Sequence, residues 1–177
     1  MRLMCQHQSA ANSSSVAPPE EHFVDQVKGK RFSCTECGKC CTGKGEIWLN
    51  SRDISRIADR LNIKTASFIS GYTKAYSRAA GFRLLRSKRN ATQDCIFLKD
   101  GLCSVHDAKP LQCVTYPWWP DLMAQSEWDA EREQVCEGMD HETAQECNAL
   151  EAAAKLQAAT EFFAERDASK SARRSSM

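Results

Sequence analysis

The chain has 177 residues, which is room for one domain of ordinary size and too little for two independent hydrophobic cores. Its 24 lysines and arginines nearly balance its 23 aspartates and glutamates, which argues against a protein that binds polyanions over its whole surface. Hydrophobic residues make up 42% of the chain, enough for a packed core, and no apolar run approaches the roughly 20 residues that span a bilayer, so we expect a soluble protein without membrane contact.

The N-terminal residues 1–31 are predicted to be a disordered tail or lead-in. Residues 1–19 have no continuous apolar stretch and no lysine or arginine besides Arg2, which disfavours a secretory signal. Their Ser- and Ala-rich composition leaves an organellar transit peptide open as the alternative to a plain tail. We therefore expect a cytoplasmic protein, with an organellar matrix as the second choice, and not a secreted one. Ten cysteines in such a reducing compartment indicate metal ligation rather than disulfides.

Two helices are predicted after the Cys- and Gly-rich residues 32–45. The first begins with Ser51 as its N-cap and Asp53 in its first turn, and it ends at Asn62. A second, short helix is expected to follow Thr65. The apolar residues of the two helices recur at helical spacing, which indicates one buried face on each: Ile54, Ile57, Ala58 and Leu61, then Phe68, Ile69 and Tyr72.

A hairpin and a single helical turn follow. The segments 82–88 and 95–98 have the composition of strands, and Asp100-Gly101 is a strong turn signal that leads into residues 102–106. Pro110 can open one helical turn that reaches Cys113, because its fixed φ suits the start of a helix.

The last predicted element is a long amphipathic helix in residues 141–168. Thr143 and Glu146 form a capping box, and an apolar stripe then continues to about Ala168. The stripe favours packing on the domain's own core, with a protein partner as the alternative. Residues 169–177 are expected to form a disordered basic tail. The elements together predict an α+β, mostly α fold: one small domain in residues 32–140 with a short β-hairpin, organised around a cysteine-ligated metal centre, plus the long C-terminal helix.

The cysteines dominate the chemistry of the chain. Cys34, Cys37, Cys40 and Cys41 lie in the run CTECGKCC, and two-residue spacing lets consecutive thiolates converge on one ion. The adjacent Cys40 and Cys41 cannot easily point the same way in an extended segment. They are therefore suited to ligating two different centres, or to one ligating and one bridging.

Four more cysteines, predicted to lie at the ends of elements, follow as Cys95, Cys103, Cys113 and Cys136. Eight cysteines in residues 34–136 suit two four-thiolate sites, two clusters, or one cluster with spare thiols. A closed tetrathiolate zinc site could contribute about 10 kcal/mol or more to folding. The outlying Cys5 and Cys147 are interpreted as lone thiols.

Residues 32–138 resemble the CxxCxxCC cysteine-cluster family of zinc- or iron-chelating proteins, which also includes flagellin lysine N-methylases. The resemblance runs through CTECGKCC, GEIWLNSRDISRIADRL, FISGY, DCIFLKDGLC and KPLQCVTYPWWP in that order. It implies that zinc or iron is bound by these eight cysteines: Cys34, Cys37, Cys40, Cys41, Cys95, Cys103, Cys113 and Cys136. Binding of the iron as an iron–sulfur cluster is left open.

Aromatic residues follow Cys113 closely. We interpret Tyr116, Trp118 and Trp119 as groups that shield the metal centre from water, with a stacking platform for a base or substrate as the alternative. The Tyr116 hydroxyl could donate to a thiolate sulfur or simply pack.

Charge is strongly asymmetric along the chain. Residues 51–90 hold ten basic and two acidic side chains, whereas residues 91–165 hold four basic and fifteen acidic ones. Residues 74–89 hold basic and no acidic side chains, and they form a candidate anion-binding patch: Lys74, Arg78, Arg83, Arg86, Lys88 and Arg89. The favoured alternative is a solvated surface that faces the acidic half of the molecule. Nucleic acid is disfavoured as the ligand.

Two functions remain open at this point. The first is a metal-binding protein that chelates zinc or iron. The alternative is an iron–sulfur-dependent enzyme of the flagellin lysine N-methylase type, or a redox protein. No G-x-G-x-x-G segment and no phosphate loop are present, and no catalytic residue can be assigned. A disulfide-stapled secreted module is disfavoured by the N-terminal residues.

Overall fold

The computed structural model describes residues 17–76, 79–142, 144 and 148–174. Its α-helices are α1 (Glu21–Val27), α2 (Ser51–Arg60), α3 (Thr65–Tyr72), α4 (Leu111–Thr115), α5 (Gln125–Gln134) and α6 (Ala149–Arg174). Its strands are β1 (Trp48–Leu49), β2 (Thr73–Ala75), β3 (Arg83–Leu85), β4 (Leu98–Lys99) and β5 (Leu102–Cys103), and its 3₁₀ turns are η1 (Lys39–Cys41), η2 (His106–Ala108) and η3 (Pro120–Leu122). The predicted α+β, mostly α fold is confirmed.

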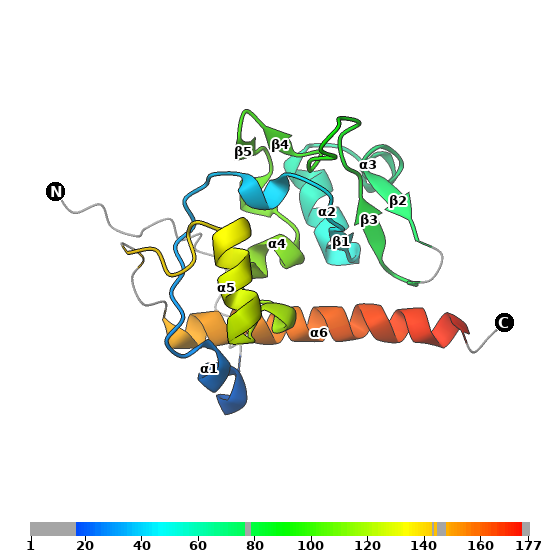
Figure 1. Cartoon of the computed structure of the whole chain (residues 1–177). Helices are drawn as coiled ribbons and strands as arrows, with labels where there is room; N and C mark the ends of the chain where they lie inside the picture. Colours follow the sequence, from blue (N-terminus) through cyan, green and yellow to red (C-terminus); the bar gives the residue numbers. More distant parts are fainter. Residues whose placement is uncertain (1–16, 77–78, 143, 145–147, 175–177) are drawn as a thin grey trace.

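The long helix α6 organises the molecule. Figure 1 shows α6 running along it, with α1 on one side and α4, α5 and the sheet of β1, β3 and β2 on the other. One face of α6 is buried within the chain itself: Ala152, Ala153, Leu156, Ala159 and Phe162. Of the predicted stripe, Ala152, Leu156 and Ala159 lie on this face, whereas Ala149 is exposed and Phe163 is partly buried. No helix in the described ranges is both long and apolar enough to cross a membrane.

The C-terminal helix is longer than predicted, since it continues to Arg174. The expectation of a disordered tail from residue 169 is therefore wrong for residues 169–174. Cations near this end lie over aromatic rings: the Arg166 guanidinium carbon is 4.8 Å from the Phe163 ring centroid and the Lys170 ammonium is 4.7 Å from the Trp48 ring centroid. Such contacts favour an ordered helix end. The predicted capping residues Thr143 and Glu146 lie outside the described residues.

The lead-in also holds structure that the sequence analysis missed. Within the predicted tail, α1 buries Phe23 and Val27 in the same apolar cluster as Leu156 of α6 and Trp118. Its three apolar residues lie among charged ones in a segment of only seven residues, which gives too short a pattern for confident detection. The expectation of disorder is therefore wrong for residues 21–27.

Helix α2 forms as predicted, but its N-cap lies one residue earlier than expected. Asn50, not Ser51, is the N-cap: its side chain accepts a hydrogen bond from the Asp53 amide, and the Asp53 carboxylate accepts one from the Asn50 amide. Asp53 is buried and also accepts hydrogen bonds from the Leu111 amide at 2.9 Å and the Arg56 guanidinium at 2.7 Å. This carboxylate therefore joins α2 to α4.

The strands pair differently from the prediction in one respect. The turn at Asp100-Gly101 joins β4 to β5, as expected, and the structure pairs Leu98 with Cys103. Segment 82–88, however, contributes β3 to an antiparallel sheet with β1 and β2, and it meets segment 95–98 only at a bridge between Ser87 and Cys95. The Cys95 amide donates instead to the Cys41 carbonyl, at 2.8 Å, a contact between residues far apart in sequence.

Candidate metal centre

The first cysteine segment turns sharply and is held in place by a close contact of Gly38. Glu36 and Gly38 have positive φ values of 56° and 73°, so the chain turns sharply between its cysteines before entering η1. A Cβ atom on Gly38 would lie 2.3 Å from the carbonyl oxygen of Gly101 in the β4–β5 turn. The segment is therefore docked closely on the hairpin that carries Cys103, an approach that only glycine allows.

A second contact holds the start of this segment against the chain that carries Cys136. The Ser33 amide donates to the Gly138 carbonyl at 3.0 Å, and Phe32 pairs with Met139 as an isolated bridge. Lys39 forms an ion pair with Glu137. Here too the approach is close, since a Cβ atom on Gly138 would lie 2.2 Å from the Ser33 carbonyl oxygen. The segment of Cys34 and Cys37 is thus fixed beside that of Cys136.

Three thiols meet where these segments join. Cys40, Cys41 and Cys95 line one small cavity, and their thiols interact with one another. This interaction lowers the pKa of Cys40 and of Cys95 to about 7 and raises the pKa of Cys41, which stays protonated. Adjacent Cys40 and Cys41 are in contact because the backbone forms a 3₁₀ turn rather than the extended segment that we assumed.

Cys103 and Cys113 lie close enough to these thiols to interact with them electrostatically. Burial raises the pKa of both, and negative charge on Cys95 and Cys40 raises them further. The positive charge of Lys109 acts in the opposite direction on both. The positive charge of Lys109 thus favours the thiolate forms of these two cysteines.

Helix α4 positions Cys113 through the buried residue next to it. The Gln112 side chain accepts a hydrogen bond from the Trp48 amide at 2.9 Å and donates one to the Glu46 carbonyl at 3.0 Å. Gln112 therefore fixes α4 against β1. Sequence reasoning missed this residue, as it missed the link between Asp53 and Leu111, because a single polar residue in a short helix carries no periodic signal.

Cys136 completes the set on the side of α5. It is buried, which raises the pKa of its thiol, while the nearby Tyr116 hydroxyl lowers it. That hydroxyl donates its single proton to Glu131 at 2.7 Å. Burial and this bond raise the pKa of Tyr116, so it stays protonated as a donor. Donation by Tyr116 to a cysteine sulfur, one of the two roles that we considered, stays a prediction.

The two tryptophans after Tyr116 occupy different environments. Trp118 is 1% exposed, and its ring lies 5.3 Å from that of Trp128 in the core cluster between α1, α5 and α6. A ring buried in this way cannot serve as a stacking platform. Trp119 is partly buried and donates its indole N–H to the Gln112 carbonyl at 2.9 Å. Both rings pack beside the cysteine-bearing segments, and their predicted shielding of a metal stays a prediction.

The eight cysteines suit a thiophilic metal in chemistry, but their side chains are not yet arranged around a common point. Nowhere in the described ranges do three or more His, Cys, Asp or Glu side chains form a group that could hold a metal ion as they stand. Cys40, Cys41 and Cys95 nevertheless line one small cavity, and Cys34, Cys37 and Cys40 are exposed. Ligation of one ion therefore requires rotation of thiol side chains. Cys5 and Cys147 lie outside the described residues.

Only some residues of the candidate anion-binding patch lie together in the structure. Four of its members line one surface pocket, namely Lys74, Arg86, Lys88 and Arg89. Arg83 does not line it, because its guanidinium donates to the Thr73 hydroxyl at 2.6 Å. Arg78 lies outside the described residues. The loop residues Ser87, Asn90 and Gln93 also line the pocket and were not singled out from the sequence.

Comparison with known proteins supports the chemistry of the cysteines. A family model, CxxCxxCC, described as a putative zinc- or iron-chelating domain, matches residues 33–147, which include all eight candidate cysteines. The match supports metal binding by this chain, without deciding between the two metals. No solved structure matches the chain.

Proposed function

Because the chain belongs to the CxxCxxCC family, we propose that it chelates zinc or iron in two adjacent four-thiolate sites. The inner site takes one ligand from the knuckle, the Cys- and Gly-rich residues 32–45, and three from the segments of the hairpin and α4; the outer site takes three from the knuckle and one from the chain after α5. The inner ligands are Cys41, Cys95, Cys103 and Cys113; the outer ligands are Cys34, Cys37, Cys40 and Cys136.

The observation that carries this proposal is the juxtaposition of Cys40, Cys41 and Cys95, which line one small cavity and whose thiols interact. Segments far apart in sequence bring these residues together, and Cys103 and Cys113 both interact with Cys95. Thiolates held this close repel one another, which is unfavourable unless a cation neutralises them. A metal ion bound as a tetrathiolate would displace the thiol protons and supply that positive charge.

The outer site is supported by the interactions of Cys136. Its thiol interacts electrostatically with Cys40 and Cys37. Backbone pairing of Ser33 with Gly138 places the segment of Cys34 beside that of Cys136. Adjacent Cys40 and Cys41 would then each serve one site, so that the two sites adjoin at the 3₁₀ turn.

The bound metal would act through its protein ligands in a defined way. Zinc and iron both favour thiolate ligands, and a closed four-thiolate site leaves no open position for substrate. The residues of this chain would orient the thiolates through Gly38, Gln112 and Tyr116, and Lys109 would offset part of their negative charge. The function supported best is therefore metal chelation, in which the bound ion stabilises the domain or is carried by it.

Single substitutions separate the two sites. In protein purified without oxygen, Cys113→Ser should lose about half of the bound metal, Cys37→Ser the other half, and the double variant nearly all of it. Metal per chain is measured by elemental analysis. Cys147→Ser is the matched control and should retain the full amount. If each single variant loses all of its metal while staying folded by circular dichroism, the eight thiols form one shared centre and the partition is wrong.

A further inference from the structure

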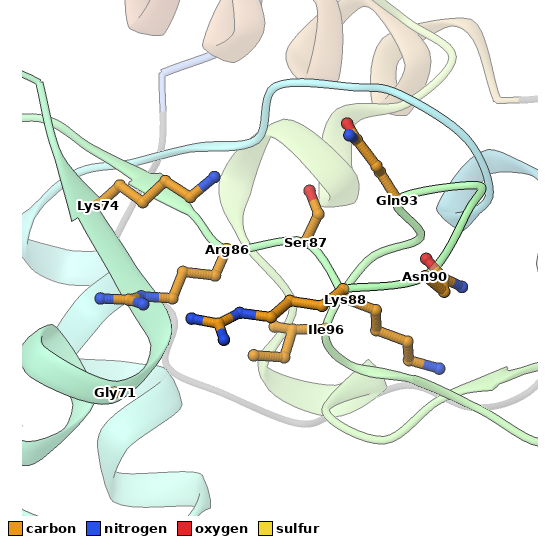
Figure 2. A pocket seen from close by; sticks show the side chains of 9 residues that line it. Gly71, Lys74, Arg86, Ser87, Lys88, Asn90, Gln93 and Ile96 are labelled. Carbon is orange, nitrogen blue, oxygen red and sulfur yellow. The ribbon is translucent and has the colours of Figure 1, made fainter.

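A basic pocket lies beside the thiols, on the side of β2 and β3. Its volume is about 580 Å³, and it lies between the end of α3 and the loop that follows β3. Figure 2 shows Lys74 and Arg86 on one side, Asn90 and Gln93 on the other, and Ser87 between them. Four lining residues are lysine or arginine, three carry neutral polar side chains, and no lining residue is acidic.

The positive charge of this pocket is largely uncompensated. In the described part of the chain, neither Lys74, Arg86 nor Arg89 has a carboxylate within ion-pair distance. The Arg86 guanidinium is held by carbonyl groups instead, donating to Thr73 at 2.9 Å and to Ser70 at 3.2 Å. Its orientation is thus fixed while its charge remains available to a ligand.

One carboxylate interacts with a residue that lines the pocket. Lys88 interacts electrostatically with Asp94, which does not line the pocket. Asp94 is already engaged, because it accepts hydrogen bonds from the Gly43 amide at 3.1 Å and from the Asn90 side chain at 2.8 Å. It shapes the loop at residues 90–94 and leaves the pocket's net charge positive.

We propose that this pocket binds a small phosphorylated molecule carrying at least two phosphate groups. A concave site of this volume falls in the range that small ligands occupy. Arginine forks and lysine ammonium groups are the usual partners of phosphate oxygens, and the neutral side chains add hydrogen bonds. Ile96 is the one apolar side chain in the lining, and no aromatic ring lines it, so nucleic-acid bases would find no surface to stack on.

The position of the pocket places such a ligand next to the cysteines. A smaller neighbouring cavity is lined by Cys40, Cys41 and Cys95, and it shares Arg86, Ser87 and Gln93 with the basic pocket. The bound anion would therefore lie one side-chain layer from the inner thiols. The inference goes beyond metal chelation and does not depend on it, because the pocket is built by side chains other than the cysteines.

Calorimetric titration of the full chain tests the proposal. The probes are fructose 1,6-bisphosphate, ribose 5-phosphate and a single-stranded oligonucleotide, in about 0.1 M salt, where weak surface attraction is partly screened. The bisphosphate should bind with a dissociation constant below about 1 mM and more tightly than the monophosphate. The double variant Lys74→Gln/Arg89→Gln should weaken that binding by about tenfold or more. Both side chains are exposed, so the fold should be unaffected.

The matched control is Lys64→Gln/Lys99→Gln, which removes the same charge from exposed residues outside the pocket lining. It should change bisphosphate binding less than about twofold. Equal weakening by both double variants would mean that only net charge matters, and the pocket would not be a site. Absence of bisphosphate binding overturns the proposal as well. Tighter binding of the oligonucleotide than of the bisphosphate would make this a nucleic-acid surface instead. Metal content, measured on the same samples, reports separately on the proposed chelation.

Discussion

Replacing Gly38 with alanine should lower the free energy of unfolding by about 2–4 kcal/mol and release metal from both proposed sites. The new Cβ atom would lie 2.3 Å from the Gly101 carbonyl oxygen and 3.2 Å from a Leu98 methyl group, and the residue has a φ of +73°. The Gly101 carbonyl belongs to the backbone, which cannot move aside as a flexible side chain would. The knuckle must therefore move away from the β4–β5 hairpin, which separates its cysteines from Cys103. Chemical denaturation and elemental analysis measure the two effects.

Gly29 supplies the matched control for this substitution. Its φ is +80°, but a Cβ atom there would meet nothing within 4 Å. Gly29→Ala should therefore show only the conformational cost of a positive φ, about 1 kcal/mol, with metal content unchanged. Equal destabilisation by the two substitutions would show that the Gly38–Gly101 contact does not constrain the knuckle.

The second large effect is expected at Asp53. Asp53→Ala removes a buried carboxylate that accepts hydrogen bonds from the Leu111 amide, the Arg56 guanidinium and the Asn50 amide. The partly buried Leu111 and Asn50 amides would lose their acceptor, whereas the exposed Arg56 keeps the Lys109 carbonyl, so we expect a loss of about 3–5 kcal/mol in unfolding free energy. Because Leu111 begins the helix of Cys113, the inner site should also hold its metal more weakly.

Asp59 lies on the same helix and is exposed, which makes Asp59→Ala the control for charge and helix propensity. It should change the unfolding free energy by less than about 0.5 kcal/mol. Thermal denaturation of both variants, with and without a chelator, separates loss of the helix contact from loss of metal. A destabilisation by Asp53→Ala no larger than that of Asp59→Ala would contradict the role given to this carboxylate.

Local signals account for what the sequence predicted of the fold. The helices at residues 51–60 and 65–72 were predicted from periodicity and capping, and the β4–β5 turn from Asp100-Gly101. The strand partners of segment 82–88 were not predicted, because pairing depends on residues 48–49 and 73–75, which are distant in sequence or too short to read as strands. Helix α1 was missed for the related reason that its stability comes from packing on α6.

The candidate site likewise combines features with a local sequence signal and contacts without one. The eight cysteines were found from their number and spacing, and their assignment as ligands stays a prediction. The features that hold their segments together are nonlocal: the close approach of Gly38 to Gly101, the pairing of Ser33 with Gly138, and the hydrogen bonds of Gln112. Sequence spacing carries no signal for such contacts, since each joins positions separated by many residues.

The central claim is that two sets of four thiolates bind metal. The most direct test is X-ray absorption at the zinc and iron edges, on the full chain purified without oxygen. The claim predicts four sulfur neighbours per metal atom at about 2.3 Å and no nitrogen or oxygen in the first coordination shell. A shell dominated by nitrogen or oxygen, or a protein that contains no metal and keeps its thiols free, would contradict it.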